Sequence, residues 1–276
     1  MKSREFRLTQ LSGPYRSLSG AACAVLNQSE PADKIALTSE VAALWRQGEL
    51  NRIGGQELAG RPSRPDLPQL LLPRDMPRRR LKGEKGRIAL MHAIAHIELN
   101  AIDLAWDIVA RFHGENMPSA FYDDWITVAE DEARHFELTD EYLRDLGAAY
   151  GNLPAHDGLW EAAESTSDDL LARLAIVPMV LEARGLDTMP TTIKKLHDAG
   201  DYAGAEVLEE IAHDEIAHVA AGVRWFDFLC DRRGLDPATT FQKLVRARFK
   251  GQLKPPFASD TRAQAGFKPE YYEPLA

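Results

Sequence analysis

The residues of this sequence best suited to chemistry are glutamates and histidines on otherwise apolar helical faces. They are Glu98, Glu132, His135, Glu182, Glu215 and His218. Two of the glutamates begin the pattern Glu-x-x-His, whose two side chains share one helix face and can reach the same metal ion. Buried carboxylates lose hydration and need compensating charge. Two divalent cations beside four carboxylates and two neutral imidazoles sum to zero charge, so the pattern predicts a two-metal site.

A third copy of the pattern, Glu210 with His213, is an internal control, because so short a pattern also recurs by chance. At 100° per residue it lies roughly 140–160° from the face of Glu215, so we expect it in solvent or behind the ligands. His92 and His96 lie away from the glutamate face of their helix, so packing or a surface position is expected for them rather than ligation. The alternative that the six residues form surface ion pairs is disfavoured by their apolar neighbours.

The two halves of the pattern match each other. Glu98 precedes Glu132 by 34 residues, and Glu182 precedes Glu215 by 33. Each half is predicted to be a helical hairpin with one glutamate on its first helix and Asp-Glu-x-x-His on its second. A longer polar link separates the halves, as expected for a crossover that joins two hairpins into a bundle.

Hydrophobic periodicity predicts an all-α fold. Helices are expected over residues 84–113, 118–147, 168–184 and 201–231, with a shorter one over 191–199. Ser167 is expected to cap the third helix, and Pro178 to kink it. Three parts follow along the chain. The first is an N-terminal extension, with a helical region over 20–50 that includes a helix over 32–48, and a Pro- and Arg-rich connector. The bundle comes next, and then a C-terminal helix with an irregular, Pro-containing tail that packs on the bundle. Their boundaries are residues 1–83, 84–233 and 234–276.

Composition excludes several classes of protein. Cys23 and Cys230 have no metal-ligand spacing, which excludes a disulfide framework, a rubredoxin-type site and a cysteine-rich zinc site. The N-terminus lacks an apolar signal segment, and no run of about 18 apolar residues occurs. We therefore expect a cytoplasmic protein without a membrane span. The net charge of −9 argues against nucleic acid as a partner.

The six residues, in this order and at this spacing, resemble the ligand set of the ferritin-like di-iron carboxylate superfamily. That superfamily includes ferritins, rubrerythrins, the ribonucleotide reductase small subunit, and bacterial multicomponent and tRNA-modifying hydroxylases. The resemblance covers about residues 84–233 and implies a ferritin-like four-helix bundle. The stretch Asp-Glu-Ile-Ala-His-Val from Asp214 and the tail Pro255-Pro256-Phe257 also resemble a bacterial family of ferritin-like proteins with no established function.

The resemblance implies two iron ions, with manganese or a mixed Fe/Mn pair as alternatives and zinc as an adventitious occupant. It also implies that Asp131 and Asp214 accept hydrogen bonds from the ligand histidines, the alternative being exposed helix aspartates. Reduced di-iron reacts with O2, and the two extensions could shape a pocket. An oxidase or hydroxylase of an unidentified small substrate is therefore our first hypothesis, with the four glutamates acting in catalysis. A separate reductase would supply electrons, because the chain has no flavin or iron–sulfur motif.

Other activities of the superfamily stay open. A ferroxidase or iron-handling protein is one alternative, and a non-catalytic binding module whose metal only stabilises the fold is another. Rubrerythrin-type peroxidase activity is disfavoured by the missing cysteines. A radical-generating subunit is disfavoured because Thr139 and Gly222, one turn after each ligand histidine, are not tyrosines. The oligomeric state stays open, with a homodimer suggested by analogy because ferritin-like bundles commonly pair.

An RNA-modifying hydroxylase is suggested only by one basic cluster. Its members are Arg74, Arg78, Arg79, Arg80, Lys82, Lys85 and Arg87. Such a cluster could bind phosphates. An ordinary solvated loop that pairs with surface acids agrees better with the overall charge, so nucleic acid is not an expected partner.

Overall fold

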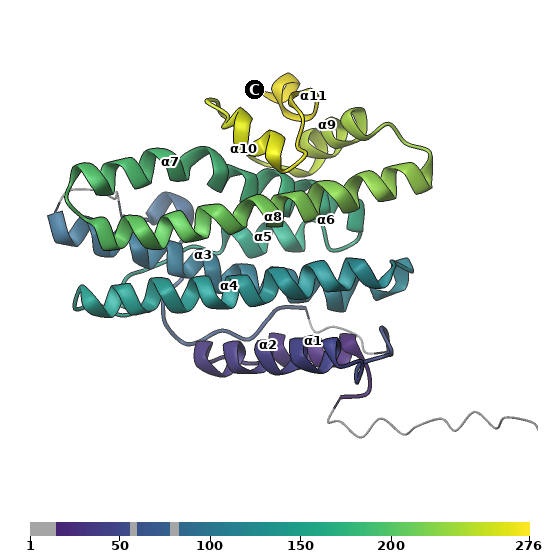
Figure 1. The fold of residues 1–276 in the computed structure, drawn as a ribbon, viewed down its shortest axis with the longest axis horizontal. Helices are drawn as coiled ribbons and strands as arrows, with labels where there is room; N and C mark the ends of the chain where they lie inside the picture. The colour runs from purple at the N-terminus through teal and green to yellow at the C-terminus, as the bar shows by residue number, and fades with distance from the viewer. Residues whose placement is uncertain (1–14, 56–59, 78–82) are drawn as a thin grey trace, which may run out of the picture.

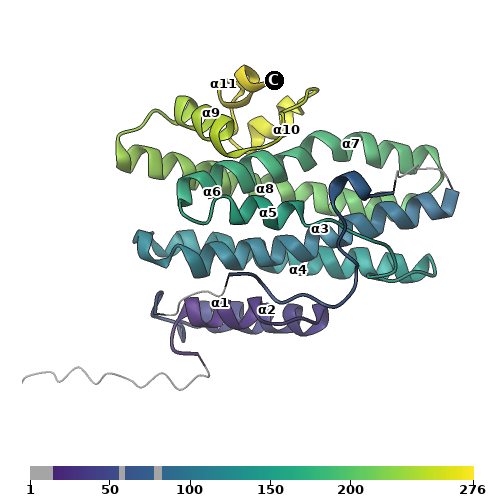
Figure 2. The same cartoon turned by 180° about the vertical axis from the view of Figure 1, so that it is seen from behind.

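The structure is a computed structural model, and it describes residues 15–55, 60–77 and 83–276. These residues are all-helical, which confirms the predicted fold class (Figure 1). No strand occurs among them, and the parallel pairing of Leu70 with Ala155 is an isolated bridge. The helices form successive layers, with the N-terminal helices on one side of the central segments and the C-terminal helices on the other (Figure 2).

The central layers hold the long helices that carry the six candidate residues. These segments are α3 (Gly83–Arg111), α4 (Ser119–Asp145), α6 (Leu170–Ile176), the π-helical segment η3 (Val177–Glu182), α7 (Ala183–Asp198) and α8 (Tyr202–Arg233). α3 packs along α4, α7 packs along α8, and α4 also contacts α8. The two predicted hairpins therefore exist, and α4 and α8 bring their Glu-x-x-His patterns together.

The third predicted helix differs from expectation at both ends. Its N-cap is Asp169, whose side chain accepts a hydrogen bond from the Leu171 amide, so the helix begins beyond Ser167. At Pro178 the helix changes to the π-helical segment η3 instead of kinking. Proline has no amide hydrogen, so it cannot donate the regular α-helical hydrogen bond. The chain then continues without a break into α7, which absorbs the short helix predicted over 191–199. Single π-turns of this kind are frequent at functional sites.

The link between the two hairpins also contains a helix that the sequence pattern did not predict. This helix, α5 (Gly158–Glu164), follows the short turn η2 (His113–Glu115) and α4 in the chain order. It contacts α3 and η3, and its Trp160 is buried against Leu104 and Val177. The link therefore packs on α3 and on the π-helical segment η3.

The N-terminal helices are α1 (Leu18–Leu26) and α2 (Pro31–Arg46), which divide the helical region predicted over 20–50. α1 lies on α3 and α2 lies on α4. Lys34 of α2 is fully buried and forms an ion pair with Asp103 of α3, whose other oxygen lies 2.9 Å from Arg64 Nε. The described part of the Pro- and Arg-rich connector is irregular apart from the turn η1 (Pro73–Asp75), and residues 78–82 of the basic cluster lie outside the described residues.

The C-terminal segment packs on the second hairpin. It forms α9 (Pro237–Arg248), α10 (Ser259–Gln264), α11 (Pro269–Tyr272) and the turn η4 (Glu273–Leu275). The tail was predicted to be irregular, but it contains the last two of these helices and the turn. Arg262 is buried beneath the rings of Phe257 and Tyr272 and pairs with Asp187 of α7 at 2.7 Å. This buried ion pair fixes the tail to the helix that follows η3.

α3 is buried on more than one face. His92 and His96 lie inside the protein, as expected, where His96 Nδ1 lies 2.8 Å from the Tyr150 hydroxyl. Among the described residues, α3 is the one helix with the length and hydropathy of a membrane span, but 78% of its 18-residue apolar window is buried. That degree of burial is typical of the core helix of a soluble protein.

Candidate metal centre

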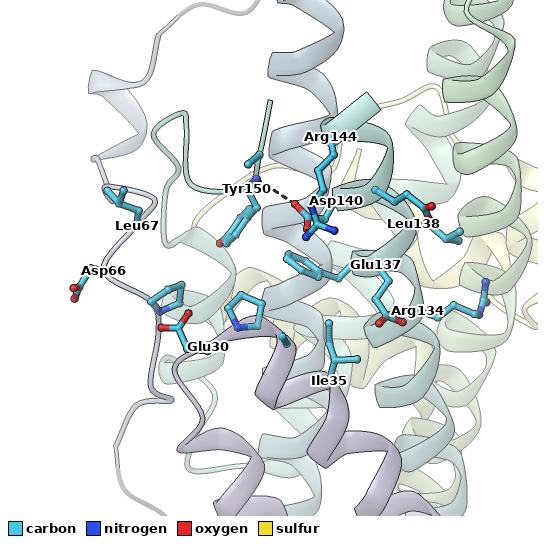
Figure 3. Close-up of a pocket in the computed structure, with 16 residues that line it drawn as sticks. Glu30, Ile35, Asp66, Leu67, Arg134, Glu137, Leu138, Asp140, Arg144 and Tyr150 are labelled. Atoms are coloured by element: carbon cyan, nitrogen blue, oxygen red, sulfur yellow. Dashed lines mark hydrogen bonds and ion pairs between the residues drawn. The ribbon is translucent and has the colours of Figure 1, made fainter. Parts of the chain in front are cut away.

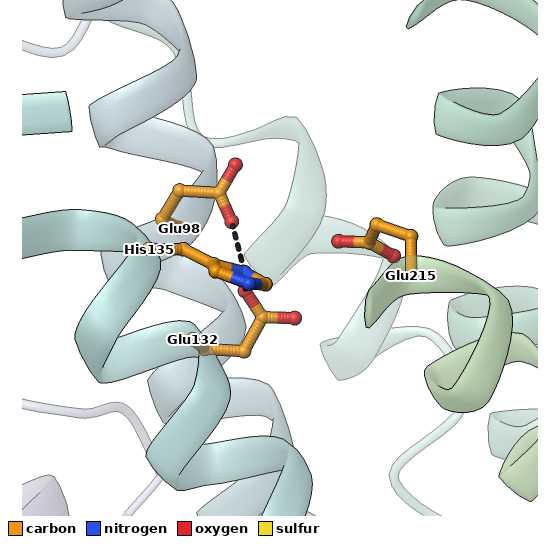
Figure 4. A group of neighbouring side chains, drawn as sticks. All are labelled: Glu98, Glu132, His135 and Glu215. Carbon is orange, nitrogen blue, oxygen red and sulfur yellow. Dashed lines mark ion pairs between the residues drawn. The ribbon is translucent and has the colours of Figure 1, made fainter. Parts of the chain in front are cut away.

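Four of the six candidate residues form a compact buried group. Glu98 of α3, Glu132 and His135 of α4, and Glu215 of α8 each offer one ligand atom, and these atoms all lie within 4.8 Å of one another (Figure 4). His135 Nδ1 lies 3.4 Å from Glu132 Oε2 and 3.7 Å from Glu98 Oε2. Residues more than 100 positions apart in the chain therefore meet at one point, as the helical faces predicted.

Glu132 occupies the middle of this group. Its Oε1 lies 3.1 Å from His218 Nδ1, while its Oε2 faces His135. His218 Nδ1 also lies 3.8 Å from Glu215 Oε2. One carboxylate thus faces an imidazole on each side.

Glu182 completes the set from the opposite hairpin. It is the last residue of η3 and lines the same cavity as Glu98, Glu132 and Glu215. Burial, followed by the nearby charges of Glu215 and Glu132, raises the pKa of Glu182 well above its ordinary value. The structure therefore brings all six predicted residues to one region of the core, with Glu182 half-buried because it faces the cavity.

The inward atoms of this cluster have no hydrogen-bond partners among the described residues. They are Glu98 Oε2, both carboxylate oxygens of Glu132, Glu182 Oε2, Glu215 Oε2, His135 Nδ1 and His218 Nδ1. A buried polar atom without a partner destabilises a fold by about 1–3 kcal/mol. Oxygen and imidazole nitrogen atoms gathered in this way fit divalent metal ions of the iron and manganese type.

The outward nitrogen of each histidine is held by an aspartate from the other hairpin. His135 Nε2 donates to Asp214 Oδ2 at 3.2 Å, and His218 Nε2 donates to Asp131 Oδ2 at 3.3 Å. A carboxylate can only accept, so each contact keeps a proton on Nε2, and Nδ1 faces the cluster as the nitrogen that would bind metal once it is deprotonated. The sequence pattern indicated these two aspartates but not the exchange between α4 and α8.

Arg134 joins the two aspartates and was missed by sequence reasoning. Its guanidinium forms ion pairs with Asp214 and with Glu210, and Nη2 lies 3.7 Å from Asp131 Oδ1. Glu210 belongs to the control copy of the pattern, and it faces outward together with the exposed His213. The spacing of three residues from Asp131 to Arg134 was the available signal, since such pairs share a helix face.

The charges of the cluster are strongly coupled. Burial raises the pKa of Glu98 well above its ordinary value, and the charge of Glu132 raises it further. Burial also opposes the ionisation of Glu132, but the nearby imidazoles of His135 and His218 outweigh it and lower its pKa. At His135 the nearby carboxylates of Glu132 and Glu98 overcome burial and raise its pKa to about 11. Protons and metal ions are therefore expected to compete for these side chains.

Two cavities lie on different sides of the cluster. One, of about 330 Å³, lies between α3 and α7 and is lined by the four glutamates and by apolar side chains. The other, of about 1020 Å³, is an open cleft between α2, the connector and α4 (Figure 3). Charged side chains such as Glu137 and Asp140 line this cleft, and none of the six candidate residues does.

The fold and the site together define an all-helical protein with a buried glutamate–histidine cluster. The chain belongs to the family described as "Protein of unknown function (DUF455)", whose sequence profile matches residues 27–273. It is 43% identical over 213 residues to an uncharacterized protein of Haemophilus influenzae (strain ATCC 51907 / DSM 11121 / KW20 / Rd). That alignment covers 74% of this chain and 72% of the relative. No solved structure matches the chain.

Proposed function

We propose that this protein is a ferritin-like di-metal carboxylate oxidoreductase that binds two iron ions and oxidises or hydroxylates a small organic substrate with O2. The supporting observation is the convergence of four carboxylates and two imidazole Nδ1 atoms whose inward atoms lack hydrogen-bond partners. Two divalent ions would satisfy these atoms and balance the four carboxylate charges. Manganese could replace one or both irons, because the donor set does not discriminate between them.

The positions of the side chains suggest how the ions would be shared. Glu98 lies beside His135, Glu215 lies beside His218, and Glu132 faces both histidines. Asp131 and Asp214 would keep each imidazole in the tautomer that binds metal. When bound, a pair of irons supplies electrons for the reduction of O2 and Lewis acidity at the substrate.

The protein's own groups would provide for proton transfer and for exclusion of water. Burial raises the pKa values of Glu98 and Glu182, so either carboxyl group would hold a proton in the metal-free protein and release it when an ion binds. Apolar side chains form the remaining walls, among them Ile94 and Leu208. Such walls limit water at the site and strengthen its electrostatic interactions.

The cavity favours an oxidase over the two main alternatives. A metal that only stabilises a fold is usually enclosed by protein ligands on all sides, whereas this cluster opens into a space of about 330 Å³. A ferroxidase would need a polar route for hydrated iron, and the route here is lined mainly by apolar residues. We expect the reaction to take place in the cytoplasm, with electrons from a separate reductase.

The test is metal content and O2 uptake of anaerobically iron-loaded protein, compared among Glu132→Ala, Glu215→Ala and the matched control Glu210→Ala. Wild type and Glu210→Ala should hold about two irons per chain and consume O2 when reduced. Both other variants should lose metal. No bound metal in the wild type, or equal metal in all variants, would refute the proposal. Bound iron without O2 uptake would refute the oxidase and leave only a metal site that stabilises the fold.

A further inference from the structure

The central helices are not packed equally on all sides. α3 packs along α4 and α7 packs along α8, but α3 and α7 make few contacts with each other. The space between them is the cavity of about 330 Å³, with the four glutamates of the cluster on its wall. Ile97 at its edge is 48% exposed although it is a large apolar residue. The carboxylate cluster is therefore reached from the surface through an apolar passage.

The lining of the passage has few groups that could recognise a polar molecule. Apart from the glutamates and Arg184, its polar side chains are Thr188 and Thr192. Their hydroxyls donate within α7, to the carbonyls of Arg184 and Thr188, each at 3.0 Å. Most other lining residues are aliphatic, such as Leu181 and Met189. A ligand would therefore gain affinity mainly by burying apolar surface.

Gly185 widens the passage one turn from Glu182. A methyl group added there would meet only Met189 Cε, at 3.9 Å, so packing does not require glycine at this position. Gly222 of α8 is the opposite case, because an added methyl would lie 2.5 Å from Pro178 Cβ. A glycine inside a helix costs about 1 kcal/mol relative to alanine. At Gly185 no close packing contact requires the glycine and so explains this cost in helix stability. The glycine instead leaves space beside the carboxylate cluster.

Arg184 is a cation at the edge of the passage. Its side chain is exposed, and its Nη1 donates to the Lys254 carbonyl at 2.9 Å. Within the described part of the chain it has no ion-pair partner. An anion there could form a charge-assisted hydrogen bond with a guanidinium that no carboxylate already occupies. Between Arg184 and the glutamates the passage is lined mainly by apolar side chains, so the apolar end of such an anion would lie deeper in the passage than its charged end.

We propose that this passage binds an amphipathic organic acid, such as a medium-chain carboxylate, with its apolar end towards the four glutamates and its anionic end at Arg184. That its apolar end is the part oxidised rests on the proposed function, whereas binding itself does not. The volume lies at the lower end of the range for small-molecule sites, so a single chain or ring system fits better than a large polycyclic molecule.

Titration calorimetry with decanoate and 1-decanol tests the proposal, on protein with and without bound metal. Wild type should bind decanoate in both states. Gly185→Phe, which fills the passage, should weaken decanoate binding at least about tenfold, while the matched variant Gly185→Ala should bind nearly as wild type. Arg184→Gln should weaken decanoate about tenfold and leave 1-decanol nearly unchanged. Ala93→Leu narrows the passage from α3 and serves if Gly185→Phe does not fold.

Each other outcome would overturn part or all of the assignment. Equal decanoate binding by wild type and both filling variants would place the ligand elsewhere. An equal effect of Arg184→Gln on both probes would remove the head-group contact. Decanoate binding only to metal-loaded protein would mean that the carboxylate coordinates the metal, which reverses the orientation. Binding as proposed in a protein that fails to hold iron would keep the ligand site and refute only the oxidase.

Discussion

The two sides of the carboxylate cluster are built in opposite ways. On the side where α4 meets α8, each histidine Nε2 donates to an aspartate of the other helix, and Arg134 joins the two aspartates. On the side where α3 faces α7, the helices stand apart around an apolar cavity. The first side is polar and connected, and the second is apolar and open.

This difference separates two requirements of a reactive metal site. Histidine orientation and tautomer must be fixed, which requires outer hydrogen bonds with defined geometry. Substrate must also reach the ions, which requires space without competing polar groups. Assigning each requirement to a different pair of helices lets the protein satisfy both. The π-helical η3 carries Glu182 on the open side, where the helical ladder is already irregular.

The largest expected effect is the change of metal affinity with pH. It tests whether the histidines on the polar side and the glutamates on the open side both carry protons before metal binds. The pKa values of His135 and His218 on the polar side, and of Glu98 and Glu182 on the open side, are all raised. Groups with raised pKa values keep their protons to higher pH, and metal ions must displace them. Affinity should therefore rise with pH between about 6 and 8, by about tenfold per unit for each proton released.

Calorimetry of Mn²⁺ binding in buffers of different ionisation enthalpy counts these protons. Release of more than about two protons per chain would show that glutamates on the open side carry protons as well as the two histidines. Release of about two would confine the effect to the histidines. A pH-independent affinity would contradict the charge coupling described for this cluster.

A smaller effect is expected from breaking the polar side. Asp131→Ala and Asp214→Ala should each weaken metal binding about 10–100-fold, because the histidine of the opposite helix loses the acceptor that orients it. Since the contacts cross, Asp131→Ala should perturb the ion beside His218, and Asp214→Ala the ion beside His135. Competition with a metal-sensitive dye measures the affinities.

The control for this pair is Glu210→Ala, which removes an exposed partner of Arg134 without touching either histidine. It should change metal affinity less than about twofold. Equal losses of metal affinity in all three variants would mean that these carboxylates act only through their negative charge and not by orienting the histidines. No loss in either aspartate variant would show that packing alone orients the imidazoles.

Sequence reasoning predicted the parts of this molecule that depend on helical periodicity. The four segments that carry Glu98, Glu132, Glu182 and Glu215 follow from apolar stripes and from the matched spacing of the two halves. The separation of Glu210 from the cluster follows from the same 100° rule. These features are local to one helix, so a single sequence suffices to predict them.

Features that depend on contacts between helices could not be predicted in this way. The π-helical turn at Pro178 needs the neighbouring Gly222, which leaves room for the proline ring. The link helix α5 is held by burial of Trp160 against residues from two other segments. The cavity exists because α3 and α7 stand apart, and no periodicity within either helix encodes that distance.

The smallest expected effect is on the free energy of unfolding, and it is seen by comparing two glycines of the second hairpin. Gly185 lies beside the open cavity, and Gly222 is packed against Pro178. Gly222→Ala should destabilise the fold by about 1–3 kcal/mol, because the added methyl would lie 2.5 Å from Pro178 Cβ and must displace it. Gly185→Ala should stabilise it by roughly 0.5–1 kcal/mol, since the methyl would only make an ordinary contact with Met189 Cε at 3.9 Å and helix propensity improves. Urea unfolding curves at constant m-value give both differences. If both variants were destabilised alike, the space beside Gly185 would be closed in solution, and the contrast between a packed and an open side would fail.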